Sequence, residues 1–94
     1  MNAQDLTLNI AVNLDRLGRW VHEGKFSRVP AFLAETEDYL NKLEEVERSS
    51  KFDRTFKIFR NKFQVLKNNH NYDEVWAEEA LTWANILQHR AKLA

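Results

Sequence analysis

The sequence predicts an all-α protein, a four-helix and mainly antiparallel bundle with short loops, in which residues 1–94 form a single helical domain. Three observations favour this fold. Only two Gly and one Pro interrupt the 94 residues, which indicates long helices rather than turn-rich β structure. Apolar residues recur every three or four positions in four successive stretches. A chain of this length can bury one hydrophobic core without metal or disulfide support, but not two.

The first helix is expected over residues 4–23, where Gly24 takes the left-handed conformation that ends it. Asn13 falls inside its apolar arc. It either fixes the register of the bundle through a partner or lies at a solvated edge, and we favour the edge. Gly18 costs about 1 kcal/mol relative to Ala, so it marks either a close helix crossing or an undemanding position. The core stripe consists of Leu6, Ile10, Leu14, Leu17, Trp20 and Val21.

The second and third helices are expected to form a hairpin. Ser27 is the predicted N-cap of the second, with Pro30 in its first turn, and Ser50 is the predicted N-cap of the third. The core face of the second helix comprises Val29, Phe32, Leu33, Thr36, Tyr39, Leu40 and Leu43. The third buries a narrow seam of Phe52, Phe56, Phe59, Phe63 and Leu66.

Only three residues separate these two helices. If the helix continued unbroken, its apolar stripe would turn by about 170° between Leu43 and Phe52, and the two halves would face opposite sides. We therefore predict a tight reversal at Ser49 and Ser50. The alternative is a domain-swapped helical dimer in which the second and third helices are continuous.

The fourth helix follows a polar loop and is expected to begin after Asn71 as N-cap. Its core face comprises Trp76, Ala80, Trp83, Ala84, Leu87 and Ala91. The whole non-polar arc spans about 200°, wider than one packed face needs. Glu79 and Arg90 fall inside this arc as core-facing charges, where they either pair across a subunit interface or leave Arg90 extending to solvent.

Charges are balanced over the chain but segregated along it. The 14 basic and 14 acidic residues cancel, yet residues 29–47 hold six acids and one base, while residues 51–67 hold six bases and one acid. An acidic helix beside a basic one predicts a hairpin with complementary flanks. The alternative is a nucleic-acid contact formed by Lys51, Arg54, Lys57, Arg60 and Lys62.

Seven branched aliphatic residues fall outside the four core stripes, where a single bundle would leave them in water. Repeated along several helices, such residues predict a protein interface, most simply that of a homodimer or of one subunit in a larger assembly. The candidate interface residues are Val75, Ile86, Leu93, Ile58, Val65, Leu8 and Val12.

The residue types that support catalysis are sparse or isolated. The chain has no Cys, its three His are far apart in sequence, and its three Ser lie at predicted caps and turns. We therefore expect no enzyme activity, catalytic residue, metal or cofactor. No apolar run approaches the roughly 20 residues that span a bilayer, so we expect no membrane partner and a cytoplasmic location. The leading hypothesis is a non-enzymatic, self-associating interaction or regulatory module.

Overall fold

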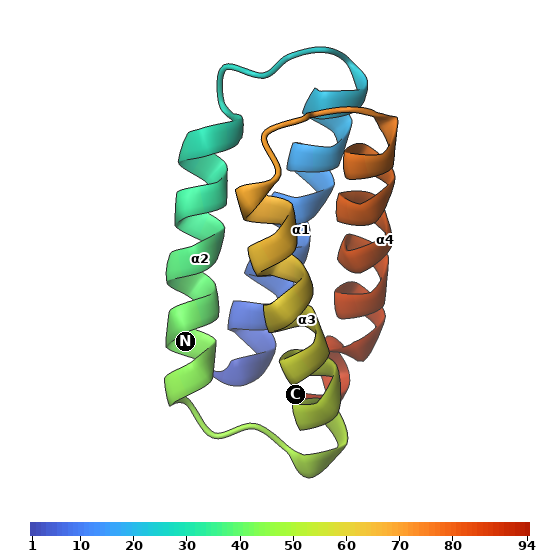
Figure 1. Cartoon of the computed structure of the whole chain (residues 1–94). Coiled ribbons are helices and arrows are strands. Elements are labelled where there is room, and N and C mark those ends of the chain that lie inside the picture. The colour runs from blue at the N-terminus through green and yellow to red at the C-terminus, as the bar shows by residue number, and fades with distance from the viewer.

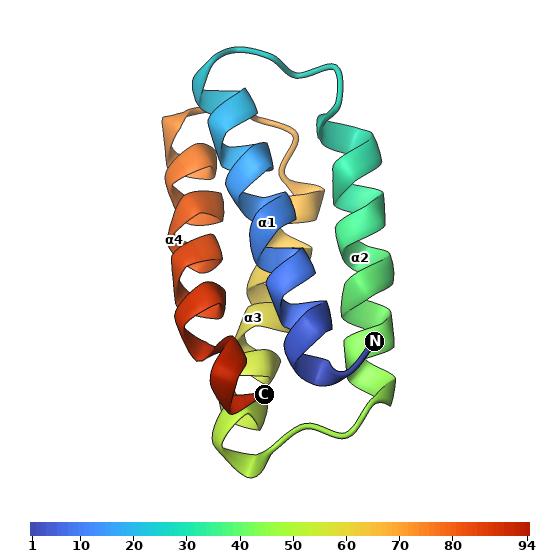
Figure 2. The same ribbon diagram turned by 180° about the vertical axis from the view of Figure 1, so that it is seen from behind.

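The computed structural model describes all 94 residues and confirms the predicted four-helix bundle. Its helices are α1 (Ala3–His22), α2 (Val29–Glu45), α3 (Ser50–Asn68) and α4 (Glu74–Arg90), followed by a 3-10 turn, η1 (Ala91–Leu93). The helices run alternately up and down, with α1 and α3 at diagonal corners (Figures 1 and 2). The chain reverses between α2 and α3, as predicted, so these are two helices rather than the continuous one of the swapped alternative.

The predicted N-caps of α3 and α4 are wrong by one or two residues. Ser49 rather than Ser50 caps α3, and Asp73 rather than Asn71 caps α4. In each case the side-chain oxygen of the capping residue accepts a hydrogen bond from the backbone amide three residues later. The sequence offers neighbouring residues of suitable type, and the path of the loop decides which one takes the extended conformation of a cap.

The connection between α1 and α2 is partly as predicted. Gly24 has a φ of 74°, which is the left-handed conformation expected after α1. The prediction of Ser27 as the cap of α2 is wrong, because the N-cap position is Arg28 and no side chain caps this helix. Pro30 follows in the first turn, where its missing amide hydrogen removes no intrahelical bond.

The core contains every residue of the predicted Phe-rich seam of α3 and most of the other predicted stripes. Asn13 differs from our expectation, because its residue surface is only 4% exposed. Its side-chain amide donates a 2.9 Å hydrogen bond to the carboxylate of Glu35 on α2. Asn13 is therefore a buried polar residue with a partner on a neighbouring helix, and the prediction of a solvated edge is wrong.

Small residues allow α1 and α4 to approach each other closely along their length. Ala77, Ala80 and Ala84 of α4 are buried, as is Gly18 of α1. A β-carbon added at Gly18 would lie 2.6 Å from Cγ of Leu81 and 3.0 Å from the carbonyl oxygen of Ala77. Gly18 thus marks a close helix crossing, the first of the two interpretations that its position allowed.

Candidate interaction surfaces

The groove between α3 and α4 collects the most exposed branched aliphatic residues. Val65 of α3 and Val75 of α4 line it together and are 68% and 75% exposed. Ile58 is 43% exposed and lies two turns before Val65 on the same stripe of α3. Ile86 lies three turns after Val75 on α4 and is half-buried rather than exposed. We refer to the following six residues as the α3–α4 face: Ile58, Lys62, Val65, Val75, Glu79 and Ile86.

The other three candidate interface residues lie elsewhere. Leu8 and Val12 are exposed on α1, beside Met1. They line a groove between α1 and α4 with Asn85 and Gln88, and neither of them lines the groove between α3 and α4, which lies on another side of the bundle (Figure 2). Leu93 is half-buried and packs against the core. The seven residues that the sequence grouped together therefore do not form one continuous surface.

Two opposite charges lie in the α3–α4 groove beside its valines. Lys62 of α3 and Glu79 of α4 both line the groove, and neither takes part in an ion pair within the chain. Glu79 accepts a 3.3 Å hydrogen bond from the indole nitrogen of Trp83. It is half-buried at the groove rather than core-facing, which corrects the prediction.

Arg90 has a partner within the chain. Its guanidinium donates a 3.2 Å hydrogen bond to the hydroxyl oxygen of Thr55 on α3. No ion pair links Arg90 to Glu79 within the chain. Pairing of Arg90 with Glu79 across a subunit interface stays a prediction.

The acidic α2 and basic α3 pair along their flanks, as the charge pattern predicted. Lys67 of α3 lies 2.6 Å from a carboxylate oxygen of Glu37 on α2, and Arg60 forms an ion pair with Glu44. The hydrogen bond from Lys67, followed by that from Gln64, holds the pKa of the Glu37 carboxyl below its ordinary value. Much of the basic charge of α3 is thus neutralised within the bundle.

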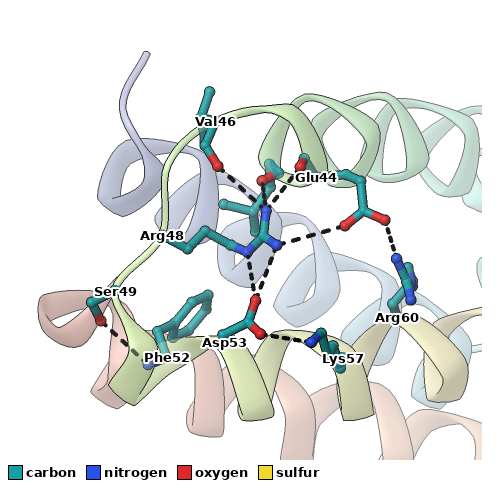
Figure 3. Close-up of polar contacts among 9 residues, drawn as sticks. Glu44, Val46, Arg48, Ser49, Phe52, Asp53, Lys57 and Arg60 are labelled. Carbon is teal, nitrogen blue, oxygen red and sulfur yellow. Dashed lines mark hydrogen bonds and ion pairs between the residues drawn. The ribbon is translucent and has the colours of Figure 1, made fainter.

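Arg48 joins the end of α2 to the start of α3 (Figure 3). Its guanidinium donates hydrogen bonds of 2.6, 2.9 and 3.3 Å to carbonyl oxygens at the end of α2 and in the following turn. These carbonyls belong to Leu43, Glu44 and Val46. The last carbonyls of a helix lack intrahelical partners, so one side chain satisfies groups that would otherwise depend on water.

The same guanidinium reaches the first turn of α3. It lies 3.0 Å from Asp53 and its central carbon is 4.1 Å from the ring centroid of Phe56. Hydrogen bonds from Lys57 and then Arg48 lower the pKa of the Asp53 carboxyl. Sequence reasoning treated Arg48 only as part of a short connection. A basic residue just beyond a helix end was the available signal for this contact.

The five candidate nucleic-acid contacts fall into two groups. Lys57 forms a 2.9 Å ion pair with Asp53, and Arg60 pairs with Glu44. The other three have exposed side chains without ion pairs: Lys51, Arg54 and Lys62. The Phe side chains of α3 are buried in the core, so they offer no platform for stacking bases.

The remaining polar groups form no larger cluster. A ring nitrogen of His22, at the end of α1, lies 3.0 Å from a carboxylate oxygen of Glu74 at the start of α4. The structure contains no group of three or more His, Cys, Asp or Glu residues placed to hold a metal ion. None of the helices combines the length and the apolar character needed to cross a membrane.

Comparisons with protein-family models, with curated proteins and with solved structures found no match to this chain.

Proposed function

We propose that this protein is a non-enzymatic helical interaction module that self-associates through the α3–α4 face. The observation that carries the proposal is the convergence of Val65 and Val75, from two different helices, on one groove. Polar groups border these apolar side chains, including Lys62, Glu79 and Asn69. An apolar centre with a polar rim is the usual composition of a protein interface.

The low helix propensity and the exposure of Val65 and Val75 in the isolated chain support the same proposal. Val is a poorer helix former than Ala, Lys or Glu, and an exposed Val gains little from packing. Burial of one such side chain by a partner contributes on the order of 1.5–3 kcal/mol. Val65 and Val75 are therefore unfavourable choices for the free bundle and favourable ones for a bundle whose α3–α4 face is covered.

Sedimentation at micromolar concentrations tests this proposal with matched variants. Val65→Asp and Val75→Asp are expected to weaken self-association at least tenfold, because each buries an unpaired carboxylate in the interface. Both positions are exposed, so the helical circular dichroism should be unchanged. Position 75 is also in the first turn of α4, where an acid suits the helix dipole.

The matched control is Val12→Asp on α1, an exposed valine outside the α3–α4 face. It is expected to leave both the fold and the self-association unchanged. A wild-type chain that remains monomeric over the whole concentration range would contradict the proposal. So would equal effects of the substitutions at positions 12, 65 and 75.

Nucleic-acid binding is the second candidate, supported by the exposed, unpaired Lys51, Arg54 and Lys62. It requires binding of a DNA or RNA oligonucleotide that weakens steeply between about 50 and 200 mM salt. Lys51→Glu combined with Arg54→Glu should then abolish the binding. No detectable binding at low salt would remove this candidate.

A further inference from the structure

We propose that two copies of the chain pack through their α3–α4 faces about a two-fold axis parallel to the long axis of the bundle. In this arrangement Lys62 of each copy pairs with Glu79 of the other copy. The inference rests on the proposed function, because it specifies the geometry of the same face. Lys62 and Glu79 form no ion pair within the chain, and in this arrangement they select one orientation of the dimer over another.

The relative heights of the residues follow from the fold. α3 and α4 are antiparallel neighbours (Figure 1), and Lys62 and Val65 of α3 line the same groove as Val75 and Glu79 of α4. These four residues therefore lie at similar heights along the bundle. A two-fold axis along the bundle leaves heights unchanged and places α3 opposite α4 of the second copy. Lys62 then faces Glu79, and Val65 faces Val75, each contact occurring twice.

The charges discriminate against the other simple two-fold arrangement. A two-fold axis that lies in the interface but runs perpendicular to the helices would place each helix opposite the same helix of the second copy. If this axis passed through the centre of the groove, Lys62 would face Lys62 of the other copy, and Glu79 would face Glu79 of the other copy. Juxtaposed like charges oppose association, whereas the parallel axis places opposite charges together at both sites. Charge complementarity thus favours a second copy, in one orientation, as the occupant of the groove.

The long side of the bundle that carries the α3–α4 face is large enough for the interface of a stable dimer. The bundle measures 37 × 19 × 18 Å, so one long side has a footprint of about 700 Å². Full coverage by a second copy would bury about 1,400 Å² over the two chains, within the range of specific protein interfaces.

No ion pair in the chain competes for Lys62 or Glu79.

Charge reversal in the full chain tests the arrangement. Lys62→Glu and Glu79→Lys should each weaken self-association at least tenfold, because either change places like charges in both cross-subunit pairs. An equimolar mixture of the two variants should form a heterodimer with nearly wild-type affinity, because opposite charges then face each other at both sites. Sedimentation of each variant and of the mixture gives the three dissociation constants.

The matched control reverses two charges on the opposite side of the bundle. Lys42 and Glu45 line a groove between α1 and α2, remote from the α3–α4 face. Neither forms an ion pair in the chain. Lys42→Glu and Glu45→Lys should leave self-association unchanged, both alone and mixed. Circular dichroism of all four variants establishes that they are folded.

The outcomes separate this inference from the proposed function. If Val65→Asp weakens the dimer but the charge variants associate like the wild type, the Lys62–Glu79 arrangement is overturned and the interaction module stands. A mixture that associates no better than its components also overturns the arrangement. A wild-type chain that is monomeric at every concentration overturns both.

Discussion

The α1–α4 and α2–α3 interfaces hold neighbouring helices together in different ways. The backbones of α1 and α4 approach closely along their length, and Gly18 of α1 lies against Leu81 and Ala77 of α4. The backbones of α2 and α3 have few close approaches. Bulky Phe side chains fill the core beneath α3, and long charged side chains connect the two helices at their edges.

This difference shows that two helix pairs in one small bundle can depend on different physical properties. Close backbone approach makes the α1–α4 interface sensitive to added volume, because packed interiors have little free space. Charged side chains at the edge of α2 and α3 can reorient, so individual ion pairs there contribute little. The losses of stability caused by substitutions in the two interfaces should therefore differ both in magnitude and in salt dependence.

The largest effect is expected from added volume in the α1–α4 interface. Gly18→Val should lower the free energy of unfolding by about 2–3 kcal/mol, although Val is a better helix former than Gly. The added atoms would displace Leu81 and press on the carbonyl of Ala77. Urea unfolding provides the measurement. The cost should be smaller in a Leu81→Ala background, and an equal cost in both backgrounds would argue against this contact.

A smaller loss is expected from Arg48→Met at the junction of α2 and α3. Removal of the hydrogen bonds to the carbonyl oxygens at the end of α2 should destabilise the fold by about 2 kcal/mol. Arg54→Met is the matched control, since Arg54 is exposed on α3 and forms no ion pair. Its effect should remain within about 0.5 kcal/mol. Equal effects in thermal unfolding would mean that the connecting contacts are unimportant.

The smallest effect is expected at the Glu37–Lys67 pair. Glu37→Lys or Lys67→Glu should each cost about 0.5–1 kcal/mol, and the double exchange should restore most of the loss at low salt. If the free energy of unfolding lost in the double exchange equals the sum of the two single losses, the pair does not couple the helices.

The same pair predicts a dependence on pH. The carboxyl of Glu37 has its pKa lowered in the fold from an ordinary value of 4.5. The pair therefore stabilises the fold above that value, and the contribution is lost as the pH falls through the lower folded pKa. The difference in stability between wild type and Lys67→Met should be present near neutrality and shrink as the pH is lowered below 4.5. A constant difference across this range would contradict the pairing.

The periodicity of apolar residues was sufficient to predict the helices and most of the core. In α3, the spacing of the Phe residues identified the buried face without reference to any neighbour. Helix starts were less accurate, because Ser49 and Ser50 have the same side chain and the loop geometry selects between them. Arg48 was missed because a basic residue just beyond a helix end does not by itself reveal which carbonyl oxygens and which carboxylate it reaches.

The candidate surface was predictable only in part. Angles around each helix identified Val65 and Val75 as residues outside the core, but they did not reveal that the two line one groove. The same reasoning placed Leu93 with them, although η1 folds it against the core. Asn13 was misassigned because its hydrogen-bond acceptor, Glu35, is on another helix.

The local features of this protein were predictable from its residues alone: four amphipathic helices, the reversal between the second and third, and the complementary charges of that hairpin. These follow from helical periodicity and from charge, which depend on residues close in the chain. The packing of the helices against one another decides which small residues meet at Gly18, which carboxylate accepts from the buried Asn13, and which surplus aliphatic residues share a groove. Those outcomes depend on the distances between helices, and such distances are set by the packing of side chains far apart in sequence.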